Sequence, residues 1–231
     1  MDFEWSKAQQ DFRSTVRAFL AANLPDNWEE LAHGPGSEAQ TVFSKQFCGA
    51  LAEAGLLVPH WPARWGGRDA DPWTAFILAE EMWAAGEPRG GQYMNVNWIG
   101  PTLMLYGSAE QQARYIPPMA SGQTLWCQGF SEPEAGSDLA SLRTRAERHG
   151  DAYRINGQKI WTSYAGHADT CFLLARTAPG KGGISILLVP MDTPGITVRQ
   201  IPSIIGEGDI HEVFFDEVEV PASARLGEEG Q

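Results

Sequence analysis

The apolar residues of this chain change their spacing near Ser121-Gly122, and this change constrains the fold more than any other feature. Before it, apolar residues recur with the period of amphipathic helices. After it, short runs alternate between apolar and polar residues and are separated by turn residues, which is typical of antiparallel strands. We therefore predict an α+β chain in which an all-α N-terminal domain, residues 1–122, precedes an antiparallel β-barrel or sandwich domain, residues 123–231.

The first domain should contain five helices. Asp71 followed by Pro72 is a typical helix start, and Ser108 with Gln111 has the spacing of a capping box. Apolar stripes are formed by Phe12, Val16, Phe19 and Leu20 in the first helix and by Val42, Phe43, Phe47 and Leu51 in the second. Four helices are expected over residues 6–23, 37–54, 73–85 and 93–106, and a short fifth one should end before Pro117.

The second domain should contain many short strands. The pair Asn156-Gly157 predicts a hairpin turn, and other turn signals include Gly150-Asp151. Because no helical pattern lies between the strands, a barrel or sandwich is favoured over a doubly wound sheet. The strands are expected over residues 125–130, 143–148, 152–155, 158–163, 170–176, 184–189, 197–201 and 212–220.

The charge and cysteine content argue against several classes of function. The formal net charge is −12, whereas non-specific nucleic-acid binding and attachment to anionic membranes need a basic surface. The chain has no apolar run long enough for a membrane span and no signal peptide at its polar N-terminus. Its 3 cysteines are widely spaced, which favours reduced thiols in a cytoplasmic protein over disulfides or a metal site.

The segment between Trp126 and Cys171 holds the candidate site. Taken alone, the loop 131–138 is either a surface turn or a nest of backbone amides for a cofactor. Taken alone, Trp161 favours core packing and Lys159 a solvated strand position. The chain has no glycine-rich dinucleotide loop, no P-loop and no hydrolase elbow, and its five histidines lack metal-ligand spacing.

Together, these motifs resemble the acyl-CoA dehydrogenases, a family of FAD-dependent enzymes. The order is SEPEAGSD at 131–138, then GD-x-Y-x-I-NG-x-K-x-W at 150–161, then AGHAD at 165–169. The resemblance extends to GSAEQQ at 107–112, DTPGI at 192–196 and FFDEVEVP at 214–221. It covers almost the whole chain and implies that the helical domain and the middle β domain of that family are both present.

The resemblance also implies roles for individual residues. The loop from Gln128 to Ser137 would follow the flavin, with Phe130 and Ser131 at the polar edge of its ring. Ser137 would lie where the FAD phosphate and the pantetheine of the substrate meet, and the helix over 93–106 would line the acyl tail. The implied FAD-binding residues are Gln128, Gly129, Phe130, Ser131, Ser137, Trp161 stacked on the flavin, and Thr162 and Ser163 near its N5.

The implied activity is FAD-dependent α,β-dehydrogenation of an acyl-CoA thioester, with electrons passed to an electron-transfer flavoprotein in a homo- or hetero-oligomer. Family members continue into a C-terminal helical bundle that supplies the catalytic glutamate, and no Asp or Glu of this sequence aligns with that role. Two alternatives remain open. One is an oxygen-using flavoenzyme of the same fold, an acyl-CoA oxidase or a flavin monooxygenase. The other is a non-catalytic subunit or fragment that needs a partner.

Overall fold

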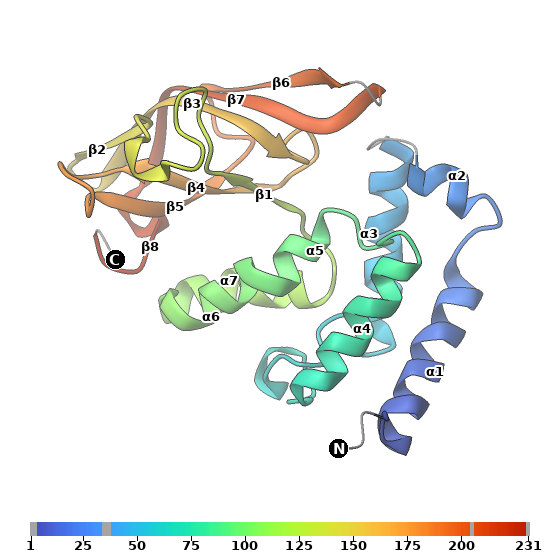
Figure 1. Ribbon diagram of the computed structural model, residues 1–231. Helices are drawn as coiled ribbons and strands as arrows, with labels where there is room; N and C mark the ends of the chain where they lie inside the picture. The colour runs from blue at the N-terminus through green and yellow to red at the C-terminus, as the bar shows by residue number, and fades with distance from the viewer. Residues whose placement is uncertain (1–3, 34–37, 204–205, 230–231) are drawn as a thin grey trace.

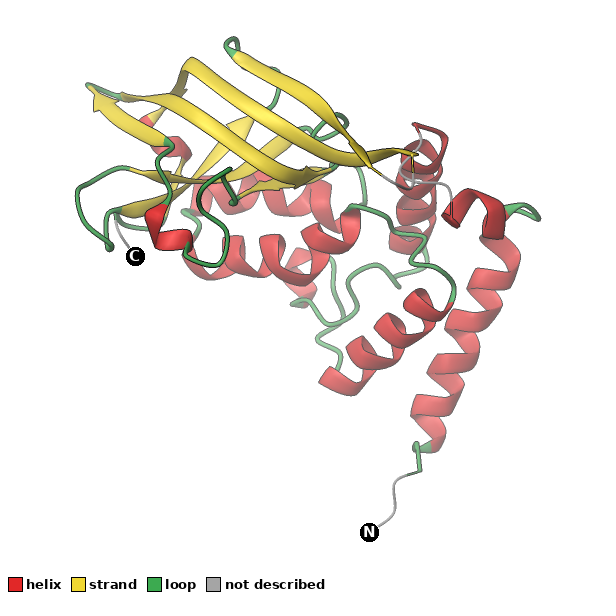
Figure 2. Ribbon diagram, turned by 45° about the horizontal axis from the view of Figure 1, so that its top comes forward, coloured by secondary structure: helices red, strands yellow, loops and turns green. Residues whose placement is uncertain are grey.

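The computed structural model describes residues 4–33, 38–203 and 206–229, and it confirms the predicted α+β class. Helices come first along the chain and strands follow, with the sheet lying over the last helices (Figures 1 and 2). The helices are α1 Lys7–Asn23, α2 Trp28–His33, α3 Glu38–Glu53, α4 Pro72–Ala84, α5 Gln92–Met94, α6 Gly100–Tyr106 and α7 Ala109–Ala120. The strands are β1 Trp126–Gly129, β2 Arg145–His149, β3 Ala152–Ser163, β4 Thr170–Arg176, β5 Ile184–Pro190, β6 Ile196–Ser203, β7 Gly206–Pro221 and β8 Arg225–Leu226.

The helix starts follow the capping signals of the sequence. The Asp71 carboxylate accepts hydrogen bonds from the first turn of α4, and Ser108 and Gln111 form the predicted reciprocal capping box at the start of α7. The predicted end of this last helix is wrong, because α7 continues through Pro117 and Pro118. The two prolines lie in its last turn, with only two helical residues after them. The helix therefore loses only the two hydrogen bonds that their missing N–H groups would have donated.

The second predicted helix is α3, although the predicted first residue, Ser37, lies outside the described part of the chain. Phe47 and Leu51 are buried as expected, whereas Val42 is 50% exposed and its predicted inward orientation is wrong. Neighbouring residues of a helix point about 100° apart. The stripe that continues from Phe43 through Phe47 to Leu51 therefore leaves Val42 on the solvent side.

The helix expected over 93–106 is interrupted by a wider, π-helical turn at Asn95–Ile99. Within this turn the buried Asn95 amide donates to Thr124 O at 2.7 Å, and its Oδ1 accepts from Trp126 N at 3.2 Å. Trp98 Nε1 donates to Gln128 Oε1 at 3.0 Å. Such turns are frequent at functional sites, and this one fastens the helix to β1.

The strands form an 8-stranded sheet in the order β6-β7-β3-β2-β4-β5-β8, with β1 beside β4. Most neighbours are antiparallel, but β1 and β2 both run parallel to β4. Gly150-Asp151 makes the predicted turn between β2 and β3, since His149 pairs with Ala152.

The hairpin predicted at Asn156-Gly157 is wrong, because β3 runs straight through this pair. Its partner β7 is long enough to pair with β3 from Pro221 to Ile210. The ladder accommodates the pair with a bulge in β7 at Glu217, where φ is +52°. Asn156 stabilises this bulge, since its Oδ1 accepts from Glu217 N at 2.9 Å. Asn-Gly therefore marks an irregular ladder here, and no reversal of the chain.

The two faces of the sheet belong to two apolar cores. One face, which includes Trp126, Phe172 and Leu188, packs with the helices. The alternate residues Cys127, Cys171 and Leu187 face a second core inside the β part. Within the described residues, each helix is too short or too polar to cross a membrane.

Candidate functional site

A second bulge near the end of β3 turns Trp161 out of the sheet. Lys159 pairs with Val213 and Thr162 with His211, so three steps along β3 match two along β7. Strict alternation would bury Trp161 on the same side as Lys159. The extra residue reverses this order, so Trp161 is 60% exposed and Thr162 is 1% exposed. Trp161 adopts φ +60°, a conformation that costs energy for a large side chain and is frequent at functional sites.

The loop 131–138 is fixed beside this bulge. Ile160 N donates to Ser131 O at 2.9 Å, which joins the start of the loop to the residue before Trp161. Glu132 and Ala135 bond to each other through both main chains, at 2.9 and 3.1 Å, and so close the loop. Phe130 stacks on Phe172 of the helix-facing core, with centroids 6.2 Å apart.

A buried ion pair lies beneath the loop. Lys159 Nζ is 2.8 Å from Glu132 Oε1 and donates to Phe130 O at 2.9 Å, and the lysine side chain is fully buried. The predicted solvated position of Lys159 is therefore wrong. The Glu132 carboxylate also accepts from Arg143 N at 2.6 Å and from Thr144 N at 2.9 Å. These bonds connect β3, the loop and the segment before β2.

The pKa values of this pair reflect opposing influences. Burial raises the pKa of Glu132, but hydrogen bonds from Lys159 and Thr144 outweigh burial and hold this pKa below its ordinary value. Burial also lowers the pKa of Lys159, against the opposing effect of the Glu132 carboxylate. The sequence interpretation missed this pair as a feature of the site. A signal was present, since Tyr153, Ile155 and Lys159 share one side of an alternating strand, which places a charge among buried residues.

The structure brings most of the expected site residues to one place. Ser131 is joined to the residue before Trp161, and the half-buried Ser163 follows two residues later. Gln128 bonds to Trp98, and Phe130 accepts from Lys159. Ser137 is exposed in the same loop, and among the contacts of the described residues none joins it to Trp161.

Two expected site residues, Gly129 and Thr162, offer no side-chain group to a ligand. A Cβ on Gly129 would lie 2.8 Å from Cys171 Sγ, so this position requires glycine for close approach of β1 to β4. The Thr162 hydroxyl is buried and has no hydrogen-bond partner among the described residues. Thr162 would therefore meet a ligand on the exposed side through its main chain.

The arrangement fits one face of a flavin. An open indole, two serine hydroxyls and strand main-chain groups lie together, and a planar ring with a polar edge needs this combination of stacking and hydrogen bonding. Within the described ranges, no group of three His, Cys, Asp or Glu side chains is placed to hold a metal ion.

Comparisons with known proteins agree with the geometry. Residues 6–123 match the family model described as acyl-CoA dehydrogenase, N-terminal domain, and residues 127–218 match the one described as acyl-CoA dehydrogenase, middle domain. Acyl-CoA dehydrogenase IpdE1 of Mycobacterium tuberculosis (strain ATCC 25618 / H37Rv) is 41% identical over 227 residues. The match covers 96% of this chain and 59% of that relative, so the chain spans about three fifths of its length.

Two solved structures extend the comparison. The ChsE4-ChsE5 complex from Mycobacterium tuberculosis gives a TM-score of 0.89 at 33% identity, over 100% of this chain and 58% of that one. A glutaryl-CoA dehydrogenase from Mycobacterium smegmatis in complex with FADH2 gives a TM-score of 0.80 at 30% identity, over 98% and 57%.

Proposed function

This chain belongs to the acyl-CoA dehydrogenase family, and from that premise we propose that it serves in the FAD-dependent α,β-dehydrogenation of an acyl-CoA thioester. The observation that carries the proposal is Trp161, which a bulge turns out of the sheet beside the loop 131–138. Without the bulge the indole would be buried and the site would have no flat surface. A similar glutaryl-CoA dehydrogenase is known in complex with FADH2, and this supports the choice of cofactor.

The residues of the site would contact different parts of FAD. Trp161 stacks on the ring, while Ser131, Ser163 and the main chain from Gln128 to Phe130 and at Thr162 meet its polar edge. Ser137 contacts the region where the FAD phosphate and the substrate's pantetheine meet. Bound there, FAD would supply a hydride acceptor for the β-carbon of the acyl group. The hydroxyls of Ser131 and Ser163 would stabilise the charge that develops on the ring during this transfer.

The proton chemistry needs groups that this site does not offer. Removal of the α-proton requires a carboxylate base and a polarised thioester carbonyl. We assign neither role to the described residues, because Glu132 is held beneath the loop by Lys159 and two main-chain donors. A further part of the assembly supplies the base in this proposal. The similar ChsE4-ChsE5 structure is a complex of two proteins, which supports an oligomer. An electron-transfer flavoprotein is the proposed electron acceptor.

The cofactor assignment is tested by removing the exposed indole. Trp161→Ala should weaken FAD binding on the order of tenfold, because it deletes the stacking surface. Trp73→Ala is the matched control, since Trp73 is 57% exposed but lies on α4. Affinity is measured by titrating FAD into the apo form of the complete natural protein. Equal FAD affinities for the two variants would refute the assigned role of Trp161.

The activity is tested by anaerobic reduction. The holoprotein is mixed with a panel of CoA thioesters, and bleaching of the flavin absorbance shows which acyl groups reduce it. Rapid peroxide formation when the reduced protein meets air would favour the oxygen-using alternative. A protein that stays colourless after FAD is added would favour the non-catalytic alternative and overturn the proposal.

A further inference from the structure

An open surface pocket lies where β3, β2 and β4 run side by side, and three arginines line it. Asn156 of β3 pairs with Arg145 of β2, and Arg145 pairs with Arg176 of β4. Residues opposite each other in a ladder point to the same face of a sheet, so these three side chains form one row. Arg143 is the third arginine, and among the described residues no Asp or Glu lines the pocket. The side chains of Arg143 and Arg145 are 80% and 64% exposed, so the pocket is open to solvent.

Arg176 is held in place without a compensating carboxylate. Its guanidinium donates to Ala140 O, Leu142 O and Gly180 O, and all three acceptors are neutral main-chain carbonyls. Within the described part of the chain, no ion pair includes Arg176. A guanidinium fixed in this way keeps its charge and loses little conformational freedom when an anion binds.

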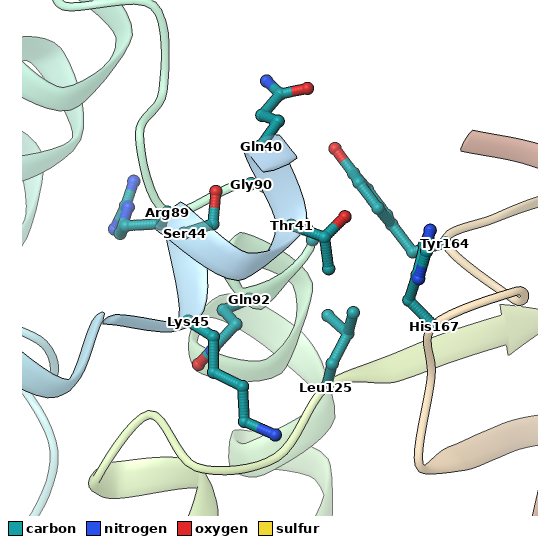
Figure 3. Close-up of a pocket in the computed structure, with 11 residues that line it drawn as sticks. Gln40, Thr41, Ser44, Lys45, Arg89, Gly90, Gln92, Leu125, Tyr164 and His167 are labelled. Carbon is teal, nitrogen blue, oxygen red and sulfur yellow. The ribbon is translucent and has the colours of Figure 1, made fainter. Parts of the chain in front are cut away.

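Two buried cations elsewhere in the described chain do have carboxylate partners. Lys159 pairs with Glu132 at 2.8 Å. Arg89 lines the small cavity between α3 and the turn after β3 (Figure 3), and it bonds to Glu87 at 2.6 and 2.7 Å. The pocket across β2 and β4 differs from these sites, because the charge of Arg176 is left uncompensated.

The two arginines of the β2–β4 ladder also repel each other, since like charges directly opposite on neighbouring strands destabilise a sheet. Arg145 lies 3.8 Å from Glu147, which is too far for a hydrogen bond. Arg143 pairs with Glu134 at 3.1 Å. Both of these pairs are exposed, so they contribute little and can yield to a stronger anion. An anion that bridges Arg145 and Arg176 would remove the repulsion between them.

We propose that this pocket binds the phosphate groups of a small molecule. A guanidinium presents a fork of donors that matches the oxygens of a phosphate. Several arginines together suit the multiple charge of a diphosphate, whereas a carboxylate carries one charge and compensates one arginine. In the complex, the diphosphate accepts hydrogen bonds from Arg143 and Arg145 and lies against the fixed charge of Arg176.

Two sources supply phosphates of this kind. One is the nucleotide end of a CoA thioester, which rests on the proposed function, and the other is a separate phosphorylated ligand. The position of the pocket agrees with the first source. Phe172, which stacks on Phe130 of the flavin loop, shares a side of β4 with Arg176 and lies about 13 Å from it at 3.3 Å per residue. The pantetheine arm separates the thioester from the phosphates of CoA by a distance of this order.

The test is calorimetric titration of inorganic pyrophosphate into the complete natural protein, loaded with FAD and with any subunit that co-purifies. Bound FAD fills its own phosphate site. Arg145→Gln should weaken the binding of pyrophosphate on the order of tenfold, because it removes a charge-assisted contact. Arg148→Gln is the matched control, since it removes the same charge from an exposed residue of the same strand outside the pocket. It should leave the affinity unchanged.

Competition identifies the source of the phosphates. If an acyl-CoA thioester displaces pyrophosphate and the matching acyl-pantetheine, which has no phosphate, does not, the phosphates of CoA occupy the pocket. If pyrophosphate binds equally well in the presence of the thioester, the pocket serves a separate phosphorylated ligand. Either result supports the proposal.

Two other results overturn it. Absence of pyrophosphate binding, or equal affinity in the two variants, would mean that the arginines form a solvated surface without a site. Arg145-dependent binding of a polyglutamate peptide that is tighter than that of pyrophosphate would mean a site for an acidic protein segment. A protein that takes up no FAD would instead refute the proposed function, and the pyrophosphate titration would still report on the arginines.

Discussion

Replacing Lys159 with methionine should destabilise the protein strongly, because the Glu132 carboxylate would stay buried without its cation. Lys159 Nζ is 2.8 Å from that carboxylate, and the two side chains are 0% and 8% exposed. Removing one partner of a buried ion pair costs about 3–5 kcal/mol. Glu132 keeps the main-chain donors of Arg143 and Thr144, so we expect the lower end of this range.

The measurement is urea unfolding at neutral pH, with the midpoint converted to a free energy at constant slope. The matched control is Glu134→Gln in the same loop. It breaks an ion pair with Arg143 in which the side chains are 73% and 80% exposed, and exposed pairs contribute little. A loss below about 1 kcal/mol in Lys159→Met would refute the reasoning. So would an equal loss in the control.

The pH dependence gives an independent check of the same pair. In the natural protein the folded pKa of Glu132 lies below its ordinary value. Its contribution is therefore stabilising above the ordinary pKa and is lost as the pH falls through the folded value. Without Lys159, burial should raise the folded pKa. Acidification from neutral pH towards about 4.3, the ordinary value for glutamate, should then recover part of the lost stability, and a variant that only loses stability on acidification contradicts this.

Three further changes test other parts of the structure. Gly129→Ala should cost about 1–3 kcal/mol in urea unfolding, because the new methyl group would meet Cys171 Sγ at 2.8 Å; an unchanged midpoint would show that the strands can separate freely. Asn95→Ala should cost about 1–3 kcal/mol in the same assay, since two main-chain groups at the entry to β1 lose their partner, and a neutral result would mean that another partner replaces the amide. Glu81→Gln should flatten the loss of stability below about pH 4.3, the ordinary pKa of glutamate. The hydrogen bond from Arg17 holds the pKa of Glu81 below its ordinary value, so its stabilisation is present above that value and disappears as the pH falls; an unchanged acid profile would contradict this role.

The regular elements of this fold were accessible from local patterns. Capping residues such as Asp71 and Ser108 act on the helix turn next to them, so their effect is readable from a few neighbouring residues. β4 consists of a continuous apolar run that is bounded by the polar residues Thr170 and Arg176, and the strand begins and ends with them. The errors occur where a distant partner decides the outcome. Asn156-Gly157 would turn the chain in isolation, but β7 continues alongside and keeps it extended.

The site was only partly accessible for the same reason. The motifs that resemble the family placed the loop and Trp161 together, although Trp161 taken alone favoured core packing. The exposure of Trp161 depends on a register shift against β7, which no local pattern reveals. The burial of Lys159 depends on a carboxylate 27 positions away. The division of the chain at residue 122 and the individual FAD contacts remain predictions.

The extra residue in β3 affects the exposure of Trp161 and leaves the order of the strands unchanged. A strand shorter by one residue, without Thr162, would restore a regular pleat, keep its ladder with β7 and pair Trp161 with His211 on the buried side that holds Lys159. Such a protein would fold with the same topology and offer no platform for a planar ligand. The exposure of the indole on this sheet thus depends on one residue in the length of β3.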